Sequence, residues 1–187
     1  MEILRITDEV SYYKPLRAIS QSIDIVAPTA RLTQYKLVVA PGLNVLSDAA
    51  AKNLENYVRQ GGHLVLGQRS GMKDDDNALQ TQRQPGPLVD LLGGGVEQYY
   101  ALIDPVPVQG KFGSGESKLW AELLSAKDSG TEVLETYGKS NGWLDGQPAA
   151  ITRKAGNGRI TYIGAWLDDA AMQSAAKWMT EVSGVKL

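Results

Sequence analysis

Residues 22–71, with the sequence SIDIVAPTARLTQYKLVVAPGLNVLSDAAAKNLENYVRQGGHLVLGQRSG, decide the fold class. Apolar runs at 23–26 and 36–40 precede an amphipathic segment, and a third run at 64–66 follows it. Short apolar runs bounded by turn residues predict β-strands, and strands that are apolar at nearly every position are typical of a parallel sheet covered on both faces. The stretch therefore predicts an α/β protein.

The amphipathic segment carries the start and stop signals of a helix. Ser47 is a favoured N-cap residue, and Asp48 places a negative charge in the first turn, where the helix dipole favours it. The apolar residues that follow recur at helical spacing, and Gly61 and Gly62 end the pattern. We expect a helix that begins after Ser47 and ends before Gly61.

A different pattern covers the C-terminal half of the chain, from residue 96 onward. Short β-leaning segments alternate with Gly, Pro and Asn, and RKAGNGRITYIG at 153–164 predicts a hairpin around residues 156–158. We expect these strands to extend the sheet in antiparallel fashion. A last helix, capped by Asp168, follows them.

The N-terminal segment leaves two interpretations open. Residues 2–6, EILRI, form a first strand if Pro15 opens the next helix at its first turn. Alternatively, a helix runs from Thr7 and is kinked at Pro15.

Composition sets the class of protein. A chain of 187 residues, of which 43% are apolar and 21% charged, suits one compact domain spanning 1–187. The formal net charge of −2, with both signs mixed along the chain, predicts no binding to nucleic acid or to an anionic membrane. The opening residues MEILRITDEV lack the features of a signal peptide, so we expect a soluble chain, in the cytoplasm rather than secreted.

Few residues are available for metal or cofactor chemistry. The chain has no cysteine, which excludes disulfides, thiolate metal sites and cysteine nucleophiles. His63 is its single histidine. The acidic run at 74–76 lacks the alternating ligand spacing of a calcium loop. The glycines at 93–95 do not lead from a strand into a helix, as a phosphate-binding loop does, and are expected to end a short helix instead. We expect no metal and no cofactor.

Glycoside hydrolysis needs two facing carboxylates. The glutamates of the C-terminal half show no spacing that pairs any two of them, and we expect them at the surface: Glu116, Glu122, Glu132 and Glu135.

The sequence GQRSG at 67–71 raises the question of a nucleophile, because a small hydroxyl residue on a sharp turn after a strand is typical of α/β hydrolases. That motif requires G-x-S-x-G, and here Ser70 is displaced by one position while Arg69 occupies the place of the nucleophile. His63 precedes the same strand, so Ser70 also lacks a base. The turn predicts a structural or interface loop better than a catalytic one.

Several motifs in sequence order resemble a known module. They are YYKPLR at 12–17, the stretch at 23–77, PGPLVDLLGGGVEQY at 85–99, LWAELL at 119–124 and GQPAAITRKAGNGRITYIGAWLDD at 146–169, followed by the last helix. Together they resemble the β-galactosidase trimerisation domain of glycoside hydrolase family 42, over residues 12 to 185.

The resemblance implies a flavodoxin-like three-layer sandwich, related to class I glutamine amidotransferases, with a mainly parallel sheet extended by antiparallel strands. In such a family the β-galactosidase reaction belongs to a separate catalytic barrel, so no catalytic residue is carried over to this chain. The first strand of the domain is then either shortened to residues 2–6 or missing. The implied role is assembly into a homotrimer, with the barrel as a second partner.

Three residues near the turn are the interface candidates: Arg69, Ser70 and Lys73. Two alternatives from other classes stay open. One is an amidotransferase-like or esterase-like hydrolase that uses Ser70, and the other is a flavodoxin-type ligand-binding module.

Overall fold

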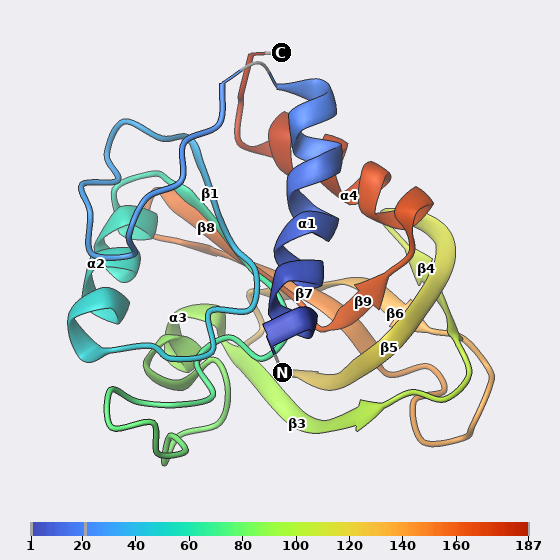
Figure 1. Cartoon of the computed structure of the whole chain (residues 1–187). Helices are drawn as coiled ribbons and strands as arrows, with labels where there is room; N and C mark the ends of the chain where they lie inside the picture. The colour runs from blue at the N-terminus through green and yellow to red at the C-terminus, as the bar shows by residue number, and fades with distance from the viewer. Residues whose placement is uncertain (1, 21, 187) are drawn as a thin grey trace.

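The computed structural model describes residues 2–20 and 22–186, with side chains from residue 10 onward. In this part of the chain, one nine-stranded sheet has helices on both of its faces (Figure 1). Eight strands follow the order β1-β2-β8-β7-β6-β4-β5-β3, and β9 pairs with β5 beside this path. Their bounds are β1 Leu37–Ala40, β2 His63–Leu66, β3 Gly94–Ala101, β4 Val106–Gly110, β5 Gly113–Ala126, β6 Thr131–Tyr137, β7 Pro148–Ala155, β8 Gly158–Ile163 and β9 Ala165–Leu167.

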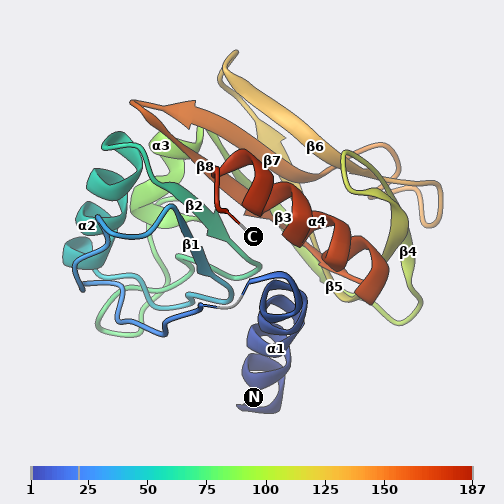
Figure 2. The same cartoon turned by 90° about the horizontal axis from the view of Figure 1, so that it is seen from above.

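The helices form the two outer layers. They are α1 Glu2–Ile19, α2 Asp48–Arg59, the short 3₁₀ turn η1 Gly86–Leu88, α3 Val89–Leu92 and α4 Asp169–Val182. One face of the sheet carries α2 and α3, whereas α4 lies across the other face with α1 packed against it (Figure 2). Each face buries its own apolar cluster, one around α2 and the other around α4. The three-layer α/β sandwich is therefore confirmed.

The two main helices begin at the predicted caps. The Ser47 hydroxyl accepts a hydrogen bond from the Ala50 N–H at 3.1 Å, and α2 buries the apolar face that the spacing indicated. An Asp168 carboxylate oxygen accepts from the Ala171 N–H at 2.9 Å at the start of α4. Both contacts satisfy an N–H that has no partner inside its helix.

The sheet is parallel at one end and antiparallel over the rest. The pairs β1–β2 and β2–β8 are parallel, and the other strand pairs are antiparallel. The hairpin around residues 156–158 is confirmed, because Ala155 pairs with Gly158 across a two-residue turn. Antiparallel strand pairs outnumber parallel ones, so the antiparallel part of the sheet is larger than the expected mainly parallel sheet would have. Short connections such as this turn can join only antiparallel neighbours.

Near the N-terminus one expected strand is absent, and of the two interpretations left open the helix is the one observed. Residues 22–27 form no strand, and the Ile25 side chain is 91% exposed. A strand needs a neighbour for its backbone groups, and β1 pairs with β2 alone among the described strands. Residues 2–6 belong to α1, so the helical interpretation holds, with a helix that starts five residues before Thr7 and runs through Pro15.

Candidate functional site at the end of β2

The turn that follows β2 is tightly enclosed. All four residues of β2 are buried, and the chain then reverses over residues 67–71. Gly71 has a φ of +65°, and a Cβ atom there would lie 2.3 Å from the Pro85 carbonyl oxygen, so only glycine fits. Arg69 also has a positive φ, +63°, although it is not glycine. This backbone conformation occurs at the residue that stands in the place of a nucleophile when the sequence is compared with a hydrolase turn.

Ser70 serves the turn itself. Its side chain is buried, with 1% of the residue exposed. The hydroxyl donates to the Gly67 carbonyl oxygen at 2.8 Å and accepts from the Leu43 N–H at 3.2 Å. Ser70 therefore connects the turn to the segment after β1. Because its side chain is buried, it can support a contact made by this turn only by holding the backbone of the turn in place.

His63 offers no base for Ser70. It is buried at the opposite end of β2, where its ring nitrogens bond the hydroxyls of Ser183 at 2.8 Å and Thr161 at 2.9 Å. Burial, and secondarily the Arg159 charge, lower the pKa of His63 to about 4. A hydroxyl without a base within hydrogen-bond reach is a weak nucleophile, so the geometry opposes a hydrolase that uses Ser70.

The strongest polar cluster beneath the turn is centred on Glu122 of β5. Its side chain is fully buried, and one carboxylate oxygen accepts from the Arg69 backbone N–H at 2.9 Å and from the Trp120 indole N–H at 3.1 Å. The other oxygen accepts from the Tyr162 hydroxyl at 2.8 Å. Burial raises the pKa of Glu122 to about 7, and these three donors oppose the rise. Glu122 thus fixes the backbone of the turn to β5 and β8.

The surface placement expected for Glu122 and Glu135 was wrong. Glu135 is also buried, and it accepts a hydrogen bond from the Phe112 N–H. A signal was present for Glu122, because alternation along β5 puts it on the same face as Trp120 and Leu124. The two glutamates bond different groups of their own chain, and neither is open to solvent. They therefore do not form a glycosidase pair, which needs a sugar between the two carboxyl groups.

Arg69 extends from the turn toward an aromatic pair. Its guanidinium lies over the Trp120 ring, 5.5 Å from the centroid, and Trp120 stacks on Tyr99 with a centroid distance of 5.2 Å. The buried Nε atom of Arg69 has no hydrogen-bond partner among the described residues. The structure thus places a cation on an aromatic support, with one enclosed N–H donor that has no partner among the described residues.

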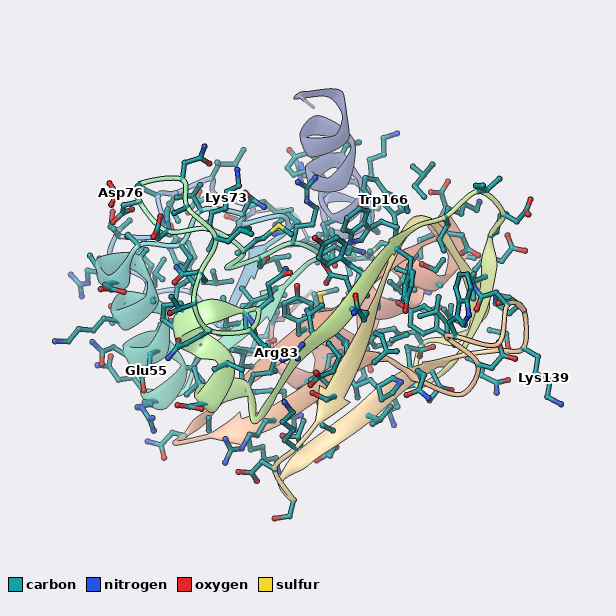
Figure 3. All side chains as sticks on the ribbon, turned by 90° about the horizontal axis from the view of Figure 1, so that it is seen from below. Glu55, Lys73, Asp76, Arg83, Lys139 and Trp166 are labelled. Carbon is teal, nitrogen blue, oxygen red and sulfur yellow. The ribbon has the colours of Figure 1, made fainter. Side chains whose placement is uncertain are left out.

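Lys73 lies on the loop that follows the turn. Its ammonium group donates to the Asn77 side-chain oxygen at 2.8 Å, and Figure 3 shows Lys73 and Asp76 on the same side of the molecule. Asp74 in the acidic run accepts from the backbone N–H groups of Asp76 and Ala78, so it shapes its own loop. The described residues contain no group of three or more side chains that could hold a metal ion. None of the described helices has the length and apolar character needed to cross a membrane.

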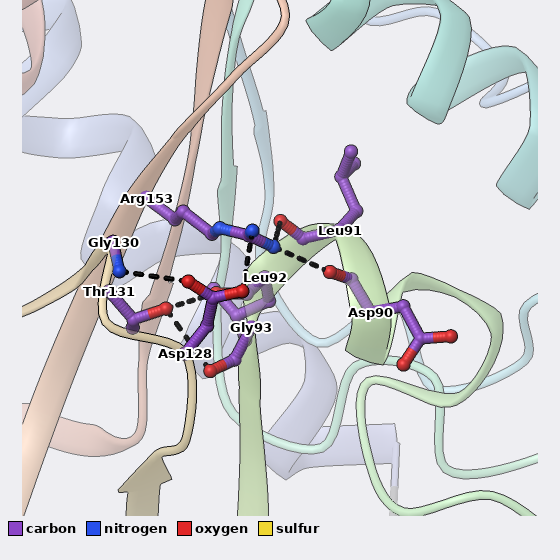
Figure 4. Close-up of polar contacts among 8 residues, drawn as sticks. All are labelled: Asp90, Leu91, Leu92, Gly93, Asp128, Gly130, Thr131 and Arg153. Carbon is purple, nitrogen blue, oxygen red and sulfur yellow. Dashed lines mark hydrogen bonds and ion pairs between the residues drawn. The ribbon is translucent and has the colours of Figure 1, made fainter.

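A second polar cluster closes the end of α3, where the glycines were expected to end a helix. Arg153 donates to the Asp90 carbonyl oxygen at 2.8 Å and forms an ion pair with Asp128 at 2.7 Å (Figure 4). Thr131 donates to the Leu92 carbonyl oxygen at 3.0 Å, and Gly93 ends the helix with a φ of +66°. These contacts satisfy the carbonyl groups at the helix end, so the cluster is structural.

Comparison with known proteins identifies the module. The family model described as the β-galactosidase trimerisation domain matches residues 3–185. The chain belongs to this family, the trimerisation domain of glycoside hydrolase family 42.

Individual members of the family agree with the match. The chain is 35% identical to a β-galactosidase of Haloferax lucentense over 179 residues, which cover 94% of this chain and 26% of the relative. It is 31% identical to a β-galactosidase of Halorubrum lacusprofundi, with 94% and 27% covered. The crystal structure of a β-galactosidase from Bacillus circulans sp. alkalophilus superposes with a TM-score of 0.90 at 25% identity, covering 97% of this chain and 27% of that one. The chain therefore spans about a quarter of the length of these relatives.

Proposed function

We propose that this chain is a single non-catalytic assembly domain, spanning 1–187, that joins β-galactosidase subunits into a homotrimer. The observation that carries the proposal is the match of residues 3–185 to the trimerisation domain family. Hydrolysis of terminal β-D-galactosides would reside in a catalytic barrel outside this chain, since such a barrel alone takes about 250 residues. The buried, base-free Ser70 supports the absence of catalysis here.

The loop after β2 is the proposed site of contact with a neighbouring subunit. Arg69 and Lys73 carry cationic side chains on this loop, and the buried Ser70 holds it to the segment after β1. Turns at the ends of parallel strands are where this fold class exposes functional surface. A contact between such a loop and a different patch of the next subunit would close into a ring of three.

Self-association can be tested with two tagged forms of the same chain. We expect an untagged copy to be retained on an affinity resin by a tagged copy after the two are mixed, with retention rising with concentration. An unrelated α/β domain of similar size, carrying the same tag, serves as the control. Retention no greater than that of the control at every concentration would oppose the proposal for this chain.

A further inference from the structure

Three basic side chains lie in one row across neighbouring strands. Lys154 of β7 stands directly opposite Arg159 of β8, and Arg159 in turn stands opposite His63 of β2. Directly opposite residues of an antiparallel pair project from the same face, with Cβ atoms about 5 Å apart. Trp178 of α4 contacts the His63 ring at a centroid distance of 5.7 Å, and the Ser183 hydroxyl bonds it at 2.8 Å. The row therefore lies on the face that α4 covers.

A cavity of about 300 Å³ lies beside this row. Its wall includes all three basic residues, together with Val182, Ser183 and the residues at 61–62 and 156–158. The residues that line it in the described part of the chain include no aspartate or glutamate. Its volume is at the lower end of the range for ligand sites, so it suits a small ligand.

Lys154 and Arg159 form a pair of like charges with no acidic partner. None of the ion pairs among residues 10–20 and 22–186 includes either side chain. The Arg159 Nη1 donates to the Thr152 hydroxyl oxygen at 3.0 Å, which holds the guanidinium in place and leaves its other N–H donors without a described partner. Like charges directly opposite each other destabilise a sheet. An anion between the two would replace this repulsion with two attractions.

Two further residues of the cavity favour a negatively charged ligand. Burial, and secondarily the Arg159 charge, lower the pKa of His63, so the field of Arg159 reaches the wall of the cavity. The Asn157 side chain makes no hydrogen bond with the described residues, and its amide is a neutral donor at the same wall.

The basic row is not needed to complete the end of α4. Carbonyl groups of residues 179–181 accept from backbone N–H groups of residues 183–185, and Lys36 donates to the Gly184 carbonyl oxygen at 2.6 Å. Lys154 and Arg159 donate to none of these carbonyl groups in the described structure. A role as helix caps therefore does not explain why both cations face the cavity.

We propose that this cavity binds a small ligand through a phosphate group, with Arg159 and Lys154 as its cationic contacts and Asn157 as a neutral donor. A phosphate group carries a charge of about −1.5 to −2 at pH 7, which matches two cations, whereas a carboxylate matches only one. The planar fork of an arginine bonds two phosphate oxygens in parallel, and a lysine acts as a point charge. The site is at the His63 end of β2, away from the loop proposed for subunit contact, and it is independent of assembly.

His63 provides a direct probe of the site, because it is the single histidine of the chain and lines the cavity. We expect its ring Cε1–H resonance to shift in a saturable manner when inorganic phosphate is added at pH 7, with sodium chloride holding the ionic strength constant. Lys154→Gln should weaken the apparent affinity at least fivefold and Arg159→Gln at least tenfold. Arg159→Lys, which keeps the charge without the fork, should weaken it less than Arg159→Gln. The matched control is Lys118→Gln, at an exposed lysine of β5 that has no described ion pair, and its affinity should stay within twofold of the wild type.

Lys154→Glu tests the same site by placing a carboxylate opposite Arg159. Opposite charges across an antiparallel pair are stabilising, so we expect a higher midpoint of thermal unfolding than for Lys154→Gln in phosphate-free buffer. We also expect this variant to lose the saturable shift of His63. The exposed position of Lys154 allows both of its variants to fold, which circular dichroism verifies.

Three results would overturn the proposal. One is a wild-type chain whose His63 resonance shows no saturable shift with phosphate. Another is a shift that keeps its midpoint in Lys154→Gln and Arg159→Gln. The third is an equal or tighter midpoint with acetate at the same ionic strength, which would assign the cavity to a carboxylate. None of these results bears on self-association, so the proposed function stands or falls separately.

Discussion

At Glu122 the chain keeps an ionisable group where its strand neighbours on the same face are Trp120 and Leu124. Its pKa rises from the ordinary 4.5 to about 7 in the folded chain. Between these values the folded carboxyl holds a proton that the unfolded chain has lost, so stability falls as the pH rises through this window. The loss is complete above about pH 7 and amounts to at most about 3 kcal/mol.

The Glu122→Gln variant should remove the contribution of Glu122 to this pH dependence. The amide oxygen can accept from the Arg69 and Trp120 N–H groups, and the amide nitrogen can donate to the Tyr162 hydroxyl oxygen. We expect Glu122→Gln to be more stable than the wild type at pH 8 and similar at pH 5, as measured by urea unfolding. A slope of similar size remains, because burial also raises the pKa of Glu135 from 4.5 to about 7.

The control for this prediction is Glu122→Ala, which leaves three donors without this acceptor and should lose about 3 kcal/mol or more relative to the wild type at pH 5. At pH 8 the deficit should be smaller, because the wild type has by then lost the contribution of the protonated Glu122. A wild-type free energy of unfolding that stays constant from pH 5 to pH 8 would contradict the assignment of a raised pKa to Glu122.

Residue-level outcomes show where sequence patterns reach their limit. The nature of the turn could be predicted, because Arg69 in the place of a nucleophile and the absence of cysteine are visible in the sequence. For Glu122 the alternation along β5 was the only signal of burial, and the donors that satisfy its carboxylate could not be predicted from the sequence. Those donors come from β2, β5 and β8, and only the folded topology brings them together.

At the scale of single elements, Asp168 connects α4 to the sheet. One carboxylate oxygen caps α4 through the Ala171 N–H, and the other accepts from the Glu116 N–H of β5 at 2.8 Å. The Ser47 side chain, by contrast, makes only the cap contact with α2 among the described residues. Removal of a cap alone costs about 1 kcal/mol. Asp168→Ala should therefore destabilise the chain by about 2 kcal/mol, which is more than Ser47→Ala.

Chemical unfolding of both variants at pH 7 measures the difference. Asp168→Asn keeps an acceptor for the Ala171 N–H and should lose less than Asp168→Ala. Equal losses for Asp168→Ala and Ser47→Ala would show that the contact with β5 adds nothing.

Elements with local signals were predicted well, and elements that depend on a partner were not. Caps, glycine stops and the two-residue hairpin are specified by neighbouring residues, so α2, α4 and the β7–β8 hairpin were confirmed. Residues 23–26 carry a strand-like sequence, yet β1 pairs only with β2 among the described strands. Whether a segment forms a strand thus depends on whether another strand lies beside it to pair with.

For the whole molecule, the account combines a three-layer sandwich with a turn after β2 whose serine is buried and bonded to the backbone, while His63 bonds other hydroxyls. These features suit a module whose activity is to hold subunits together. The family match supports the same conclusion over residues 3–185.

The most direct test of this central claim is the absolute mass of the purified chain, measured by light scattering during size exclusion over a wide range of loading concentrations. The account predicts a mass that rises with concentration to about three times the 20.2 kDa of one chain. A mass of one chain at every concentration would contradict the claim that this chain by itself carries the information for assembly.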